Sequence, residues 1–174
     1  MRHRLAFAVV TSLTLASCGL QPIYSGGGRS AAAQAMASIE VAPIADRAGF
    51  LVRSALQDRL GGAAAGGARY RLEVELDDAI EGFGIRGDDS ITRERRTLRA
   101  RYRLVSIDGT RTLLDATARS DAGVDVVRSS DYAVVAAENS ALERLAVELA
   151  EQIGTRLALL ARTTPELQAT APAR

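Results

Sequence analysis

Arginines crowd one stretch of this chain, and guanidinium groups are well suited to binding phosphate. The stretch holds six of them: Arg93, Arg95, Arg96, Arg99, Arg101 and Arg103. Each guanidinium presents planar, paired N–H donors that match the oxygens of a phosphate group. These six arginines are therefore the candidate anion-binding residues.

A structural role for the same arginines is the alternative. Glu73 and Glu75 lie on the preceding amphipathic segment and can form ion pairs with two of the three arginines Arg99, Arg101 and Arg103. At least one of the three is then left over. We expect the other three candidates, which lie nearer the turn, to be short of carboxylate partners.

Catalytic chemistry is restricted by what the chain lacks. His3 is the only histidine and Cys18 the only cysteine, and the removal of a signal peptide takes His3 away. Without an imidazole or a free thiol, the mature chain has no Ser-His-Asp or Cys-His arrangement and lacks the usual ligands of a zinc site. The pairs Asp77-Asp78 and Asp88-Asp89 remain, but adjacent strand residues point to opposite faces, and turns favour Asp for backbone hydrogen bonds. We expect no catalytic residues, no metal and no cofactor.

The first residues predict a lipid-anchored protein of the bacterial envelope. A basic start is followed by an apolar run, residues 5–15, which is too short to span a bilayer and is typical of a cleaved signal. Leu15-Ala16-Ser17-Cys18 resembles the lipobox of bacterial lipoproteins, in which the cysteine becomes the acylated first residue. Gly19 follows in place of Asp, which in well-studied systems permits export to the outer membrane. We expect Cys18 to be lipidated.

Two amphipathic segments predict a long β-hairpin. Residues 69–76 and 97–104 alternate strictly between apolar and charged side chains, which is the pattern of a strand with one buried face. The turn-rich residues 82–89 can fold the second strand back antiparallel onto the first.

The register of this hairpin is restricted, because a slip of one residue would turn arginines toward the apolar side. A turn centred near residue 87 or 88 sets Glu75 opposite Arg99 or Arg101. The same turn sets Glu73 opposite Arg101 or Arg103.

The remaining segments complete an α+β domain. Residues 38–42 form a short strand, a helix capped by Asp46 runs from Arg47 to Gly61, and residues 112–126 form a fourth strand after a tight turn at Asp108-Gly109. Leucines and Ile153 at helical spacing predict one long helix over residues 131–162 that covers the apolar face of the sheet. The predicted fold is a two-layer sandwich with a four-stranded, mostly antiparallel mixed sheet and two helices on one face.

The chain divides by composition into four parts. We expect a signal peptide over 1–17, a lipidated N-terminus and flexible Gly/Ala/Ser-rich tether over 18–37, the domain over 38–162 and a disordered tail over 163–174. The formal net charge of +1 argues against nucleic acid as a partner, because binding to nucleic acid neutralises many phosphates.

Several segments together resemble the lipopolysaccharide-assembly lipoproteins of the alphaproteobacterial type (LptE). They are the lipobox with residues 18–24, the helix start at 45–53, and Ser130-Asp131-Tyr132-Ala133 before the long helix. The resemblance implies a sandwich domain on an outer-membrane lipoprotein that faces the periplasm. It also implies a place inside a large β-barrel partner (LptD-like), which the protein would help to assemble and would plug while contacting lipopolysaccharide.

Two other classes of function remain open on the sequence. One is an auxiliary lipoprotein of a different envelope lipid transport system, such as an ABC system, which would share the anchor. The other is an envelope hydrolase that uses carboxylates alone. Co-purification with a barrel separates the first from an assembly lipoprotein, and turnover that depends on Asp77, Asp78, Asp88 or Asp89 would identify the second.

Overall fold

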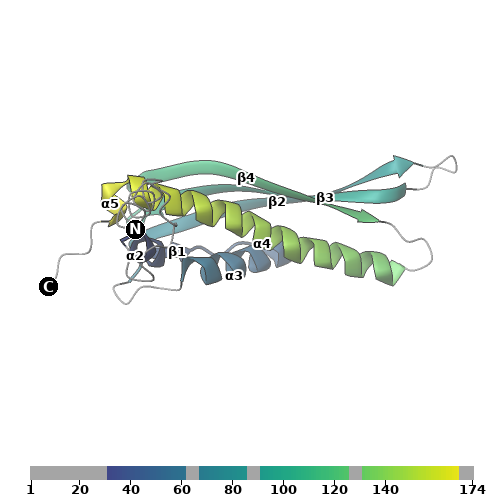
Figure 1. Cartoon of the computed structure of the whole chain (residues 1–174), viewed down its shortest axis with the longest axis horizontal. Helices are drawn as coiled ribbons and strands as arrows, with labels where there is room; N and C mark the ends of the chain where they lie inside the picture. The colour runs from purple at the N-terminus through teal and green to yellow at the C-terminus, as the bar shows by residue number, and fades with distance from the viewer. Residues whose placement is uncertain (1–30, 62–66, 86–90, 126–130, 169–174) are drawn as a thin grey trace, which may run out of the picture.

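The computed structural model describes residues 31–61, 67–85, 91–125 and 131–168, which form a four-stranded sheet with helices on one face (Figure 1). The strands are adjacent in chain order: β1 (Ile39–Val41), β2 (Tyr70–Ile85), β3 (Ile91–Ser106) and β4 (Thr112–Asp125). β1 runs parallel to β2, and the other pairs are antiparallel. The predicted two-layer α+β sandwich with a mixed sheet is confirmed.

The helical layer is dominated by one long helix. The described helices are α2 (Ala31–Ala37), α3 (Asp46–Leu60), α4 (Asp131–Thr163) and α5 (Pro165–Gln168). The 33 residues of α4 span about 50 Å at about 1.5 Å per residue. The 16 residues of β3 span about 53 Å at about 3.3 Å per residue, so α4 lies along the whole sheet (Figure 1).

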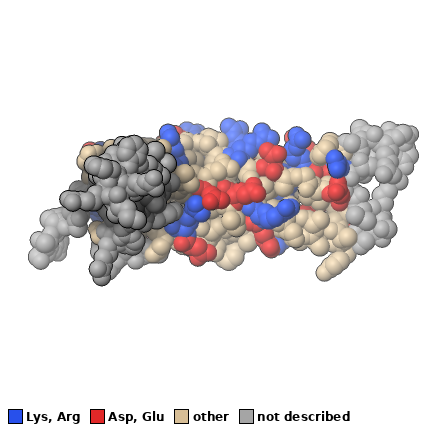
Figure 2. Space-filling model, in the orientation of Figure 1, with Lys and Arg blue, Asp and Glu red and all other residues tan. Residues whose placement is uncertain are grey.

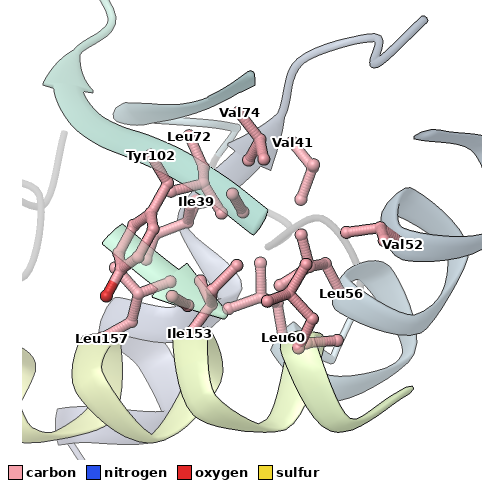
Figure 3. Packing of buried hydrophobic residues seen from close by; sticks show 14 of the residues in the cluster. Ile39, Val41, Val52, Leu56, Leu60, Leu72, Val74, Tyr102, Ile153 and Leu157 are labelled. Carbon is pink, nitrogen blue, oxygen red and sulfur yellow. The ribbon is translucent and has the colours of Figure 1, made fainter. Parts of the chain in front are cut away.

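The core lies between the sheet and the two longer helices (Figure 3). Alternate residues of the sheet enter it, and the most deeply buried of them are Leu72, Leu98, Ala100, Tyr102 and Leu104. The apolar stripe of α4 meets them, with Leu142, Leu145, Leu149, Ile153 and Leu157 buried and Leu160 partly buried. Burial of apolar surface on both layers is the main force that holds the helices on the sheet.

The register of the hairpin is the one expected for a turn centred on residue 88. Glu73 lies opposite Arg103, and Glu75 lies opposite Arg101. The turn at Asp108-Gly109 also forms, with Gly109 at φ 72° and its N–H donating to the Ser106 carbonyl at 2.8 Å. Most charged residues of the strands lie on the face without helices; Asp78, Glu94 and Arg96 are the exceptions among the described residues.

The start of α3 differs from the expectation. Asp46 is the first residue of the helix, not its cap, and has φ 65°, while Ala45 holds the capping position and makes no capping hydrogen bond through its side chain. The end is as predicted, because Gly61 adopts φ 83° and closes the helix in the left-handed conformation that glycine favours.

Both ends of the domain extend further than expected. The tether assigned to residues 18–37 includes α2, whose Ala35 and Met36 are buried, and the tail assigned to 163–174 includes α5, whose Leu167 is buried. Alanine favours the helix and its small side chain allows close packing, so a segment without a long apolar stripe still joins the core. Residues 1–30 and 169–174 lie outside the described residues.

Gly49 in α3 fits against the backbone of the preceding loop. A Cβ on this residue would lie 2.7 Å from the carbonyl carbon and oxygen of Ile44. Gly49→Ala should therefore lower the free energy of unfolding by about 1 to 3 kcal/mol, although alanine is the better helix former by about 1 kcal/mol. Denaturant unfolding measures the change, and an unchanged or raised stability would mean that the loop moves freely.

Candidate functional site

The face of the sheet without helices carries the charged residues of all three long strands. Its basic side chains are Arg71, Arg93, Arg95, Arg99, Arg101, Arg103 and Arg119. Its acidic side chains are Glu73, Glu75, Asp77, Glu81, Asp115, Asp121 and Asp125. We call this surface the open face. The two signs of charge alternate across it, and Figure 2 likewise shows blue and red atoms interspersed along the visible side of the molecule.

Two of the candidate arginines form ion pairs across the strands. Arg103 pairs with Glu73 at 3.0 Å, as expected, but Arg101 turns to Asp115 on β4 at 3.0 Å and leaves Glu75. The Arg101 guanidinium lowers the pKa of Asp115 through its hydrogen bonds, and the carboxylate in turn raises the pKa of Arg101. Arg101 thus pairs with a residue of β4, whereas the pattern of the β2–β3 hairpin predicted a partner on β2.

The arginines near the first turn are expected to be short of carboxylate partners, and the structure corrects this for Arg93 and Arg96 but not for Arg95. Arg93 pairs with Asp125 at 3.0 Å, and the Arg95 guanidinium carbon lies 5.2 Å from the ring centroid of Phe83. Phe83 belongs to β2 and Asp125 to β4, and both lie beside the N-terminal part of β3, near the first turn. Arg93 is thus held by a carboxylate, whereas Arg95 has an aromatic contact and, within the described residues, no ion pair.

Arg96 lies on the opposite face of the sheet, under α4. It pairs with Asp78 at 2.6 Å and donates to the Glu138 carbonyl oxygen at 3.0 Å, and its side chain is only 12% exposed. Alternation places residue 96 on the same face as Leu98, so its position follows from the strand geometry. Through these bonds Arg96 links β3 to β2 and to α4. It is therefore not part of the candidate site.

Arg99 is the candidate that keeps its charge available. Within the described part of the chain no ion pair or hydrogen bond of its side chain is recorded, although it lies opposite Asp77 on β2. On its other side it lies directly opposite Arg119 of β4. Arg119 is itself weakly held, 4.0 Å from Asp121 and 3.5 Å from the Thr97 hydroxyl. Like charges directly opposite one another destabilise a sheet, and a bound anion would relieve this repulsion, so the pair is a candidate for anion binding.

A second polar cluster lies on the helix side near the distal end. Glu94 of β3 lies opposite Val124 of β4 and close to Glu138 of α4. Burial of its carboxyl and the neighbouring Glu138 carboxyl raise the pKa of Glu94. Ionisation of Glu94 is unfavourable, because it would place a second negative charge beside Glu138 in a half-buried site.

This raised pKa predicts a specific pH dependence. Stability contributed by the protonated Glu94 is present below the pKa of an unfolded glutamate, about 4.3, and is lost as the pH rises through the raised folded value. Glu94→Gln removes the titration, so the variant should melt at a higher temperature than the wild type near neutral pH, and the two should converge near pH 4. Glu138→Gln should act in the same direction. A lower melting temperature of Glu94→Gln at neutral pH would contradict this assignment.

The carboxylate pairs do not form a catalytic couple in the described residues. Asp77 lies on the open face, whereas Asp78 lies on the helix face and is paired with Arg96. Asp88 and Asp89 lie outside the described residues. No group of three or more His, Cys, Asp or Glu residues suited to a metal occurs in the ranges that the structure covers.

Two further predictions concern the N-terminus and the membrane. Cys18 and the signal sequence lie outside the described residues, so lipidation stays a prediction. None of the helices within the described ranges is both long and apolar enough to cross a bilayer.

Known structures share this fold. The chain is similar to a protein described as a lipoprotein from Caulobacter crescentus CB15, with 23% identity, a TM-score of 0.63, and coverage of 78% of this chain and 98% of the other. It is also similar to rare lipoprotein B from Shewanella oneidensis, with 10% identity, a TM-score of 0.55, and coverage of 75% and 98%. A minor lipoprotein from Acinetobacter baumannii gives 14% identity, a TM-score of 0.54, and coverage of 70% and 88%. No curated protein sequence matches the chain.

The class of protein is therefore a small two-layer α+β domain with the fold seen in bacterial lipoproteins. Residues 36–157 match the family model described as lipopolysaccharide-assembly, LptE. The chain belongs to this family, and the resemblance stated from the sequence is confirmed.

Sequence reasoning missed Arg119 as part of the candidate site. Its place beside Arg99 depends on the register between β3 and β4, which shifts at Leu104/Val105. A search for arginines on the outward set of residues 112–126 could have found it, because Arg119 has the parity of Asp115 and Asp121.

Proposed function

We propose that this protein is anchored in the outer membrane through an acylated Cys18 and acts in the lipopolysaccharide translocon. In this role it helps a β-barrel partner (LptD-like) to assemble, plugs its lumen and contacts lipopolysaccharide on the way to the outer leaflet. The observation that carries the proposal is the match of residues 36–157 to the lipopolysaccharide-assembly family. The lipobox ending at Cys18 agrees with it.

Exposed apolar side chains at the distal end support a partner that surrounds this part of the molecule. On β2, Ile80 and Phe83 are exposed, and at the start of α4 Tyr132 is 85% exposed and Val135 is also exposed. Both layers therefore present apolar groups from the level of Arg96 onward. Other exposed apolar side chains, Phe50, Ile107, Val147 and Leu159, are spread over the rest of the described residues, whereas these four share one end and favour contact with another protein there.

The partner is tested by isolating the full-length lipidated protein from outer membranes under mild detergent. The proposal predicts a large β-barrel protein in equal amount with it. Co-isolation with an inner-membrane ABC transporter and no barrel would favour the alternative of another lipid transport system.

Lipopolysaccharide contact is proposed at Arg99 and Arg119 on the open face. Lipopolysaccharide carries phosphates, which relieve the repulsion between two adjacent guanidinium groups and accept paired N–H donors. Arg101 and Arg103 lie beside them and are exposed, so they can add charge by exchanging partners. Because each exposed ion pair is worth about 0.2 to 1 kcal/mol, the contribution of these two residues is moderate.

Arg99→Gln combined with Arg119→Gln should weaken binding of purified lipopolysaccharide by about 2- to 30-fold, since two exposed charge contacts are lost. The remaining binding should depend less on salt, and the melting temperature should not fall, because a like-charge pair has been removed. Binding is measured on immobilised lipopolysaccharide over a range of NaCl concentrations.

The matched control is Arg93→Gln, which removes a guanidinium that is already paired with Asp125. It should leave the binding close to that of the wild type. Equal losses in the control and in the double variant would show that total charge, and not the Arg99/Arg119 pair, governs binding.

A further inference from the structure

One edge of β2 carries no partner strand over most of its length. β1 pairs only with Tyr70, Arg71 and Leu72, and the last bond joins the Ala42 N–H to the Leu72 carbonyl at 3.0 Å. Among the described residues, nothing is paired with this edge of β2 from Glu73 onward. An unpaired edge is a template for the addition of another strand.

The direction of the free backbone groups follows from the last bond. Because the Leu72 carbonyl faces β1, the N–H and C=O groups of every second residue after it face the same side. These residues are Val74, Leu76, Asp78 and Ile80. The Arg69 carbonyl accepts from the Ile107 N–H at 2.9 Å, which confirms that the odd-numbered residues bond toward β3.

The open face beside this edge is acidic and unsatisfied. Within the part of the chain that the structure describes, Glu75, Asp77 and Glu81 form no ion pair or hydrogen bond through their side chains. For Glu75 the reason is that Arg101, which lies opposite it, pairs with Asp115 instead. Their side chains lie in one row along β2. Such a row attracts a strand that places basic side chains at alternate positions on the same face.

The helix side of the same edge is hollow and partly apolar. A cavity of about 640 Å³ has an apolar part formed by Val74 and Leu76 of β2, Ile44 and Ala48 near the start of α3, and Leu142 of α4. Its polar part is formed by Asp46, Arg47, Asp78, Arg96 and Asn139. Glu75 and Asp77 also line it, so the cavity extends over the edge itself. The other side chains of an added strand, which point to this side, would be apolar.

The opposite edge of the sheet, formed by β4, is partly covered by side chains of α4. At β4 the Gln152 side chain of α4 donates to the Arg119 carbonyl at 3.1 Å, and the Ser120 hydroxyl bonds to Glu148 of the same helix. α4 thus covers one outward carbonyl of β4, at Arg119. The two edges differ chiefly in what lies beside them, because only the β2 edge has the acidic row on one side and the cavity on the other.

We propose that the β2 edge binds an extended segment of a partner protein as a fifth strand, with basic residues alternating with apolar ones. β3, in which arginines alternate with apolar residues, already pairs with the other edge of β2 in this way. A second copy of this chain is a poor occupant, because its own β2 would set acidic rows against each other. The proposal is independent of the lipopolysaccharide contact and of the anchor.

The test uses the purified full-length protein and a fluorescent ten-residue peptide in which arginine alternates with valine. Two control peptides have glutamate in place of arginine, or the same composition arranged as a block of arginines and a block of valines. The alternating peptide should bind, the glutamate peptide should not, and the block peptide should bind more weakly. Peptide binding should also slow hydrogen exchange at the amides of Val74, Leu76 and Asp78, which are unbonded in the free protein.

Two sets of variants separate the contributions of edge and charge. Ile80→Pro removes an outward N–H without removing a bond to β3 and should abolish binding, whereas Ile80→Thr keeps the N–H and should bind. Glu75→Gln with Asp77→Asn should weaken binding by about 2- to 30-fold and reduce its salt dependence, while Asp121→Asn on β4 should not.

Four results would overturn the proposal. Equal binding of the block peptide would indicate charge attraction only, and unchanged binding by a folded Ile80→Pro variant would exclude the edge. Protection of the same amides without peptide in a monomer would mean that a segment of this chain fills the edge. Their protection in a dimer would mean that a second copy does.

Discussion

Replacing Leu149 by alanine is expected to lower the free energy of unfolding by about 2 to 5 kcal/mol, because three carbon atoms are removed from a closed core. Leu149 lies in the middle of α4 and is fully buried against the sheet. The long helix and the stiff sheet cannot both collapse into the space that is left, so much of the cavity should persist. Urea unfolding followed by circular dichroism measures the loss.

The matched control is Val147→Ala, two residues away on the same helix. Its side chain is 57% exposed, so the substitution should change stability by less than about 0.5 kcal/mol. Glu148 is not a neutral control, because it accepts a hydrogen bond from the buried Ser120 hydroxyl. Similar losses for Leu149→Ala and Val147→Ala would mean that the helix face is wrongly assigned.

Cys18→Ser is expected to leave a protein that is unprocessed or mislocalised, because the acceptor thiol for acylation is lost. An acylated N-terminal cysteine carries several chains, and stable anchoring needs more than one such signal. Fractionation of the envelope together with mass spectrometry of the mature N-terminus gives the result.

The control for this variant is Ser17→Ala, which changes the neighbouring position but leaves the acceptor thiol in place. It should be processed and anchored as the wild type is. An unmodified wild-type chain that begins at Gly19 or beyond would falsify the anchor.

The parts of the fold that sequence reasoning predicted are those in which many residues agree. Each of the strands β2 and β3 has several alternating positions, so a slip of one residue would move the whole apolar set. This limited the partner of Glu73 to Arg101 or Arg103, and the structure has Arg103. The stripe from Leu142 to Leu157 repeats over several turns, and the boundaries of α4 were predicted to within one residue.

The predictions that were wrong or missing depend on a single contact or on the position of a third strand. Arg101 can choose between Glu75 and Asp115, and exposed ion pairs differ in free energy by less than about 1 kcal/mol, so local pattern does not decide. Arg119 becomes a neighbour of Arg99 only through the register of β4. In α2 and α5, one or two buried residues such as Met36 and Leu167 hold a short helix, and so few residues produce no periodic signal.

The first and last described helices, α2 and α5, lie at the same end of the molecule, which matters for labelling experiments. α2 and α5 lie together beside the start of β2, where the Tyr70 hydroxyl donates to the Glu166 carbonyl at 3.2 Å, and the tip of the long hairpin lies at the far end (Figure 1). A tag fused beyond Gln168 is therefore attached at the same end as Ala31, the first described residue. A probe attached at Phe83 stands about 40 to 50 Å away, at about 3.3 Å per strand residue. Energy transfer between a dye at Phe83 and one in the headgroup layer would thus report whether the molecule stands upright on the bilayer or lies along it.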